Sequence, residues 1–241
     1  MTKLIIANWK QLPETIEQAM TLLDHTKTCL GAIGVSQIRY VVCPRPEYRT
    51  AAAAAIGNND SLALGAQDMS EDLSGSGAQY VIIGHSDRRW KAGDSDEVTN
   101  TKLRDALAAG LQPIVCFGER SRSDGWRDEL VAQTVATLKG LTEGQVLQCL
   151  IAYEPVWAIS TQPDAKPDTP ASAVTSMNVI RETIADHCNV SHSTYLYGGS
   201  ITPANVASFL ERSEVGGVLV GGASVRPDDV SQVISIAATI L

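Results

Sequence analysis

Eight short apolar runs, separated by longer segments, constrain the fold of this chain more than any other feature of its sequence. Each run is continuously apolar rather than alternating, as expected of parallel strands that are buried on both faces. The chain therefore contains eight candidate strands of a parallel sheet. The runs are Leu4–Ala7, Tyr40–Cys43, Leu62–Leu64, Tyr80–Ile83, Pro113–Phe117, Cys149–Tyr153, Thr194–Tyr197 and Gly217–Val220.

The segments between these runs carry signals of helices. Thr169-Pro170 and Thr202-Pro203 each place a capping hydroxyl before a proline, which predicts two helix starts, and Pro227 is expected to open the last helix. Two segments also repeat apolar residues on one helical face. These residues are Ile16, Ala19, Met20 and Leu23 in the first segment, and Ala173, Met177, Ile180 and Ile184 in the second.

Eight β/α units with no linker or composition break predict a closed (β/α)8 barrel. A barrel of this kind needs about 250 residues, so we expect residues 1–241 to form a single domain. A doubly wound sheet has the same local pattern. The glycine motif of a dinucleotide-binding fold does not follow the first strand, which favours the barrel.

One β/α unit is expected to be stunted. Only residues 66–79 join the third and fourth candidate strands. A crossover that includes its helix needs at least ~10–12 residues, and this segment has two glycines and no apolar period. At most a turn or two of helix fits between these strands.

The composition of the chain limits the binding partners and the cellular compartment that we expect for it. The net charge of −8 and the lack of a Lys/Arg run argue against nucleic acid. The five cysteines are odd in number and lack C-x-x-C spacing, which predicts free thiols in a reducing compartment. No stretch approaches the ~20 apolar residues of a membrane span, and no signal peptide is recognisable. We therefore expect a soluble, cytoplasmic protein.

Polar residues follow the ends of three candidate strands. Asn8 and Lys10 follow the first strand, His85 follows the fourth and Glu154 the sixth. In a barrel these positions converge on one rim, where the chemistry of such folds is found. Each residue alone has a simpler explanation: a rim ion pair for Glu154, a buried structural imidazole for His85 and a solvated side chain for Lys10.

Taken together, the three ionisable residues suggest proton transfer. Isomerising an α-hydroxy carbonyl compound requires a base, an electrophile that polarises the oxygens, and a cation for the enediolate charge. Glu154, His85 and Lys10 are suited to these roles.

Two glycine pairs follow the last two strands, Gly198-Gly199 and Gly221-Gly222. Each pair could be a tight turn. Loops after strands seven and eight are, however, the usual phosphate site of barrels, and bare backbone lets N–H groups approach an anion closely. We therefore predict a phosphate site built from backbone amides, those of Ser160, Ser200, Gly221 and Gly222.

The order of these motifs resembles the triosephosphate isomerase family. The resemblance runs from Asn8 to Ser224 and includes Gln67. It implies interconversion of dihydroxyacetone phosphate and D-glyceraldehyde 3-phosphate in glycolysis and gluconeogenesis, by a homodimer without cofactor or metal. The motifs are Asn8-Trp9-Lys10, Gly84-His85-Ser86, Cys116-Phe117-Gly118-Glu119 and Tyr153-Glu154-Pro155-Val156-Trp157.

The resemblance also implies individual roles. By this resemblance, Glu154 would be the base, His85 the electrophile and Lys10 the cation beside the substrate oxygens. Asn8 would add a hydrogen bond to the same oxygens. Ser86 would hold Glu154 in its resting position.

The chain departs from the family in three places. Asp87 stands where the family has Glu and would assist Lys10 from a shorter side chain. The lid that follows Glu154 begins at residues 155–159 as in the family, but it continues with Ser160 instead of Gly, and its segment 160–168 carries two prolines, which stiffen it. The short segment 66–79 cannot reach far into a neighbour, so we expect a weak or rearranged homodimer, with a monomer as the rival.

Two other functions are compatible with the same motifs. One is a different phosphosugar isomerase or epimerase that uses the same rim. The other is a barrel without catalysis that binds a phosphorylated metabolite or a partner protein, which the altered loop and lid would favour. The joint presence of Asn8, Lys10, His85 and Glu154 argues against this second alternative.

Overall fold

The eight predicted strands form a closed parallel barrel in the order β1 to β8. The computed structural model describes residues 2–33, 38–70, 73–160, 165–191 and 193–240. Every run predicted from the sequence coincides with a strand, which confirms the (β/α)8 class. The strands are β1 Lys3–Asn8, β2 Ile38–Cys43, β3 Leu62–Ala66, β4 Tyr80–Ile83, β5 Gln112–Phe117, β6 Leu150–Tyr153, β7 Thr194–Tyr197 and β8 Gly217–Val220.

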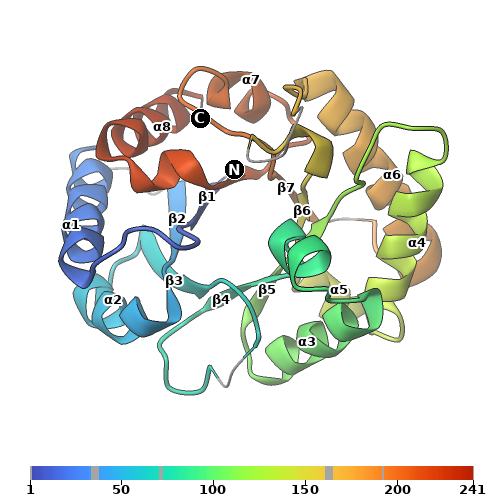
Figure 1. Cartoon of the computed structure of the whole chain (residues 1–241), viewed down its shortest axis with the longest axis horizontal. Coiled ribbons are helices and arrows are strands. Elements are labelled where there is room, and N and C mark those ends of the chain that lie inside the picture. Colours follow the sequence, from blue (N-terminus) through green and yellow to red (C-terminus); the bar gives the residue numbers. More distant parts are fainter. Residues whose placement is uncertain (1, 34–37, 71–72, 161–164, 192, 241) are drawn as a thin grey trace.

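Helices surround the barrel (Figure 1). The α-helices of the described residues are α1 Ile16–Ile33, α2 Arg49–Ile56, α3 Asp96–Ala108, α4 Trp126–Leu138, α5 Glu143–Leu147, α6 Pro170–Cys188, α7 Val206–Leu210 and α8 Pro227–Thr239. Shorter helical turns are η1 Pro46–Tyr48, η2 Asp87–Lys91, η3 Val156–Ala158 and η4 Gly222–Val225.

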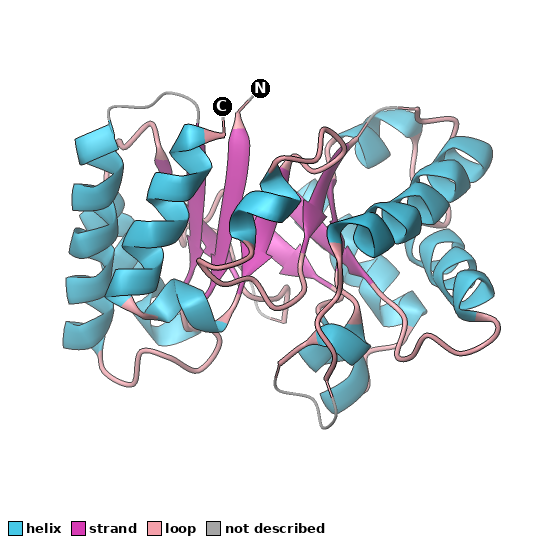
Figure 2. Ribbon diagram, turned by 90° about the horizontal axis from the view of Figure 1, so that it is seen from above, coloured by secondary structure: helices cyan, strands magenta, loops and turns pink. Residues whose placement is uncertain are grey.

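The strands are buried on both faces because the core has two layers. Residues such as Ile6 and Val41 belong to a cluster inside the barrel, whereas their neighbours Ile5 and Val42 belong to the larger cluster shared with the helices. This double burial explains why the strands read as continuous apolar runs rather than alternating ones. Figure 2 shows both chain ends at one end of the barrel, so the parallel strands all finish at the opposite rim.

Two of the three predicted helix starts are confirmed. The Thr169 hydroxyl accepts a hydrogen bond from the Ser172 amide at the start of α6, and Pro227 opens α8. The prediction at Thr202-Pro203 is wrong, because α7 begins only at Val206. The Asn205 side chain accepts a hydrogen bond from the Thr202 amide at 2.9 Å, so the Thr-Pro pair opens a turn instead.

The apolar faces of the two long helices are mostly where the sequence predicts them. In α6, Ala173, Met177, Ile180 and Ile184 are fully buried. In α1 the buried face begins at Ala19, whereas Ile16 in the first turn is 40% exposed.

The third β/α unit is stunted, as predicted. The described residues between β3 and β4 contain no helix, and this open loop lies between α2 and α3 in the ring of helices (Figure 1). Asp68 anchors the loop to its own barrel. Its carboxylate accepts a hydrogen bond from Lys102 Nζ at 2.8 Å and forms an ion pair with Arg88 Nε at 3.1 Å. The loop is therefore tied down close to its starting strand.

Among the described residues, no helix is long and apolar enough to cross a membrane. All five cysteines are free thiols, as predicted. Cys43, Cys116 and Cys149 are buried, and Cys29 and Cys188 are half-buried.

Candidate active site

The first strand delivers Lys10 to the rim in an unusual backbone conformation. Lys10 has a positive φ of 51°, which few residues with a side chain adopt. The Asn8 side chain accepts a hydrogen bond from the Lys10 amide at 3.1 Å. The Gln67 amide group donates to the carbonyls of Lys10 and Cys43, at 2.9 and 3.0 Å. These bonds hold Lys10 in its strained conformation.

His85 follows the sharp end of β4. Gly84 has a positive φ of 70°, and an added Cβ there would lie 2.8 Å from the Arg89 guanidinium, so glycine is needed. Arg89 Nε donates to the Gly84 carbonyl at 2.8 Å. The Asp87 amide donates to His85 Nδ1 at 3.1 Å. Nδ1 is thus an acceptor, so in the neutral imidazole the proton lies on Nε2.

Glu154 is a buried carboxylate with several donors around it. Its Oε2 accepts the Ser86 amide at 2.8 Å, and Oε1 accepts the Ser86 hydroxyl at 2.9 Å. His85 Nε2 lies 2.9 Å from the same Oε1. Burial alone would raise the pKa of Glu154, but His85 and these hydrogen bonds outweigh burial and lower that pKa. The carboxylate is therefore ionised at neutral pH.

The backbone at Glu154 requires a neighbouring glycine. A Cβ on Gly118 would lie 1.8 Å from the Glu154 carbonyl oxygen, far inside contact distance. The Gly118 amide donates to Gln133 Oε1 at 2.8 Å, which fixes this close approach from the side of α4.

Asp87 reaches Lys10 despite its shorter side chain. Lys10 Nζ lies 2.9 Å from Asp87 Oδ2, and Lys91 Nζ lies 2.6 Å from the other oxygen. Burial would raise the pKa of Asp87, but hydrogen bonds from Lys91 and Lys10 hold that pKa at about 2. An ionised Asp87 thus keeps the Lys10 ammonium paired at the rim.

The two glycine loops lie next to this cluster. Lys10 Cε would lie 3.8 Å from a Cβ on Gly221, and Arg226 Nη1 would lie 3.7 Å from one on Gly222. Both are ordinary contacts, so packing alone does not require glycine at either position. Gly199 differs, because its added Cβ would lie 2.1 Å from the Tyr197 hydroxyl.

At Ser160, the lid contacts the loop that follows β7. The Ser160 amide donates to Ser200 Oγ at 2.7 Å, and that hydroxyl donates to the Ala158 carbonyl at 2.9 Å. The sequence predicted the Ser160 amide as a phosphate donor, and here it is bonded to a protein hydroxyl. The lid prediction for Thr161 to Asp164 lies outside the described residues.

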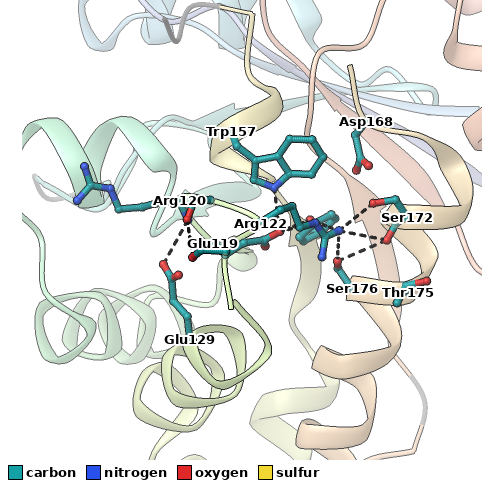
Figure 3. A network of polar contacts seen from close by, with 12 residues as sticks. Glu119, Arg120, Arg122, Glu129, Trp157, Asp168, Ser172, Thr175 and Ser176 are labelled. Atoms are coloured by element: carbon teal, nitrogen blue, oxygen red, sulfur yellow. Dashed lines mark hydrogen bonds and ion pairs between the residues drawn. The ribbon is translucent and has the colours of Figure 1, made fainter. Parts of the chain in front are cut away.

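Sequence reasoning missed a polar network around Glu119 and Arg122 (Figure 3). Glu119 is fully buried and accepts hydrogen bonds from Tyr153 Oη at 2.8 Å and Trp157 Nε1 at 2.9 Å. Burial raises the pKa of Glu119. Arg122 Nε lies 3.3 Å from the same Glu119 oxygen. Arg122 sits in a polar loop without periodicity, so no sequence signal marks it.

The rim therefore brings together a carboxylate, an imidazole and an ammonium beside two glycine loops. Among the described residues, no cluster of His, Cys, Asp or Glu side chains could hold a metal ion. A (β/α)8 barrel with this rim defines the class of barrel enzymes that transfer protons on small phosphorylated substrates.

The family follows from comparison with known proteins. Residues 3–237 match the family described as triosephosphate isomerase. The chain is 36% identical to the triosephosphate isomerase of Symbiobacterium thermophilum, over 98% of this chain and 97% of that protein. It is 38% identical to that of Chloroflexus aurantiacus, over 92% and 94% respectively. The chain belongs to the triosephosphate isomerase family.

Proposed function

We propose that the chain interconverts dihydroxyacetone phosphate and D-glyceraldehyde 3-phosphate through an enediol(ate) intermediate. Membership of the family supports this reaction. The observation that carries it is the Glu154 carboxylate, which is buried, ionised and 2.9 Å from His85 Nε2. An ionised base beside a hydrogen-bond donor is what an enolisation requires.

The proposed chemistry uses these side chains in sequence. Glu154 removes a proton from the carbon next to the substrate carbonyl, and the electron pair moves onto the carbonyl oxygen. His85 donates a hydrogen bond from Nε2 to that oxygen, and the Lys10 charge stabilises the developing enediolate. The proton of the hydroxyl on the adjacent carbon moves to the former carbonyl oxygen. Glu154 returns its proton to the former carbonyl carbon, and the adjacent carbon–oxygen bond becomes the new carbonyl. Asn8 adds a hydrogen bond to the substrate oxygens.

The resting contacts of Glu154 differ from those it needs in the reaction. The Ser86 amide and hydroxyl both bond the carboxylate. To reach a substrate carbon, the carboxylate must leave Ser86, and its basicity then rises because those donors are lost. Ser86 thus holds the base in an ionised resting position, and Asp87 keeps Lys10 in place from the other side.

The substrate phosphate lies, on this proposal, against the amides of Ser200, Gly221 and Gly222. The placement is supported by the space beside Gly221 and Gly222, where an added Cβ would lie no closer than 3.7 Å to another protein atom. Ser160 contributes its amide if the lid releases the Ser200 hydroxyl. The reaction needs no cofactor or metal, because the base, donor and cation are all side chains.

We place the reaction in the cytoplasm, in glycolysis and gluconeogenesis, with five free thiols in support. We further propose a weak or rearranged homodimer. The support is the short β3–β4 loop, whose Asp68 is tied to Lys102 and Arg88 of the same chain. A loop held in this way offers little contact area to a neighbour.

A coupled assay with D-glyceraldehyde 3-phosphate tests the proposed function. We expect isomerisation of this substrate and little or no turnover of longer phosphorylated aldoses or of epimerase substrates. Turnover of the longer sugars alone would assign the rim to a different phosphosugar isomerase. Phosphate binding without any turnover would identify a barrel that only binds metabolites.

A further inference from the structure

One arginine contacts both ends of the segment that follows Glu154. Arg122 lies in the loop between β5 and α4, and its side chain is three-quarters buried. Its guanidinium carbon is 4.0 Å from the ring centroid of Trp126 and 5.3 Å from that of Trp157. Cations at such distances are attracted by indole rings, more strongly when water is excluded.

The first end of the segment is held through Trp157. This residue lies in η3, directly after the base Glu154 and Pro155. Its indole nitrogen donates to Glu119 Oε1 at 2.9 Å, and Arg122 Nε pairs with the same oxygen at 3.3 Å (Figure 3). The indole is therefore oriented both by the Glu119 acceptor and by the guanidinium.

The second end is held through the start of α6. Arg122 Nη2 donates to Ser172 Oγ at 2.9 Å and to Ser176 Oγ at 2.8 Å (Figure 3). The two ends also meet directly, since the Lys166 amide donates to the Trp157 carbonyl at 3.3 Å. One guanidinium thus links the β5–α4 loop, η3 and α6.

We infer that Arg122 is a positioning residue for catalysis, which rests on the function proposed above. It fixes the two described ends of the lid, residues 155–160 and 165–168, relative to the strand that carries Glu154. Its Nη2 also lies 3.3 Å from the hydroxyl of Tyr153, the residue before Glu154. Fixing these described ends reduces the number of conformations open to Ser160, so the arrangement that delivers Ser160 to the phosphate loops costs less entropy.

The test compares Arg122→Met with Arg120→Met as a matched control. Arg120 lies in the same loop and also contacts an indole, but its guanidinium lies 4.9 Å from the ring centroid of Trp90, away from the lid. Amide hydrogen exchange in the segments Pro155–Ser160 and Ala165–Ser172 should speed up at least about threefold in Arg122→Met, because these amides lose their anchor. The control should leave both segments unchanged.

Kinetics supply the second readout. In Arg122→Met we expect kcat to fall about tenfold and KM to change less than about threefold, because the lost contacts position groups rather than bind substrate. Arg122→Lys should recover part of kcat, since it restores a cation near Glu119 but not the planar group between the serines and the indoles.

The same exchange rates and kcat in Arg122→Met as in Arg120→Met would overturn the inference. If Arg122→Met does not fold, a Ser172→Ala, Ser176→Ala double variant removes the two hydroxyl contacts of Arg122 to α6 and should speed exchange in residues 165–172. Unchanged exchange in that variant would also overturn it. The exchange measurement needs no turnover, so an inactive wild-type protein would refute the proposed function without deciding the role of Arg122.

Discussion

At the scale of single residues, the geometry separates the roles of Glu154 and His85. Glu154 is ionised and shielded from water, so it can accept a proton without first losing one. His85 has its Nδ1 occupied by the Asp87 amide, so Nε2 is the nitrogen that donates. A hydrogen-bond donor in this position stabilises negative charge as it develops on the substrate oxygen.

His85→Gln should lower kcat more than it raises KM, because the lost hydrogen bond matters most as negative charge develops on the substrate oxygen. We expect a loss of about 10²-fold in kcat, typical for one oxyanion donor. Steady-state kinetics with both triose phosphates would measure this loss. A rise in KM at constant kcat would make His85 a binding residue instead.

Asp87→Asn should lower stability at neutral pH but not in acid. The pKa of Asp87 is about 2 in the folded chain against 3.8 for a free side chain. Its ionised form therefore stabilises the fold above about pH 4, and this contribution is lost as the pH falls toward 2.

Allowing for solvent screening of this partly exposed pair, we expect Asp87→Asn to cost of order 1 kcal/mol in the free energy of unfolding at pH 7. Urea unfolding of wild type and variant from pH 7 to pH 3 would show whether the difference shrinks below pH 4. Asp105→Asn, on an exposed site of α3, is the control. A difference independent of pH would show that the charge of Asp87 is not its source.

Among the elements of the site, the glycine loop after β8 has room beside its backbone, whereas Gly199 in the loop after β7 is packed against the Tyr197 hydroxyl. The protein leaves room at Gly221, so a substitution there tests ligand binding more than folding. Inorganic phosphate or sulfate should inhibit competitively and raise the Tm of the wild type, since only the folded barrel presents the amides.

Gly221→Leu should abolish both inhibition and thermal protection by phosphate, because its side chain would occupy the space of the anion. Gly31→Leu is a matched control, since its added Cβ meets nothing within 4 Å on α1. Inhibition assays and melting curves with increasing phosphate would compare the two variants. Unchanged inhibition in Gly221→Leu would place the phosphate elsewhere.

The elements also show what the sequence could and could not predict. The strands were predictable because double burial makes them continuously apolar, as for Tyr80–Ile83, whose residues are all buried. The actual start of α7 was not predictable from Thr202-Pro203. The Asn205 side chain accepts the hydrogen bond of the Thr202 amide, and this closes a turn before the helix begins.

The site was predictable where a residue type and a strand end coincide, as for Glu154 and His85. It was not predictable where the contact depends on folding of distant polar loops. Arg122 joins side chains from β6, η3 and α6, and none of these contacts leaves a local pattern. The positive φ of Lys10 likewise depends on Gln67 from another strand end.

At the scale of the whole molecule, the short β3–β4 loop decides the proposed assembly. Asp68 is held by two cations of its own chain, so any dimer must rely on other surfaces. Small interfaces are usually weak, and a partner that stabilises the folded chain raises apparent stability by mass action.

We therefore expect the Tm to rise with protein concentration, and specific activity to fall on dilution if Lys10 and His85 depend on a neighbour for their positions. Sedimentation velocity and melting over a wide concentration series would measure both effects. A single dimeric species with constant Tm down to nanomolar protein would contradict this account of the loop.

In the proposed mechanism, the Glu154 carboxylate moves a carbon-bound proton of a triose phosphate. Proton NMR of D-glyceraldehyde 3-phosphate in D2O detects this step, because an enediol(ate) intermediate admits deuterium at carbon. We predict rapid conversion with carbon-bound deuterium for the wild type. Glu154→Asp should keep its fold and phosphate protection but slow conversion about 10²-fold, since the shorter side chain misplaces the base by about 1 Å. Conversion by Glu154→Asp at the wild-type rate, or product from the wild type without any carbon-bound deuterium, would contradict the account.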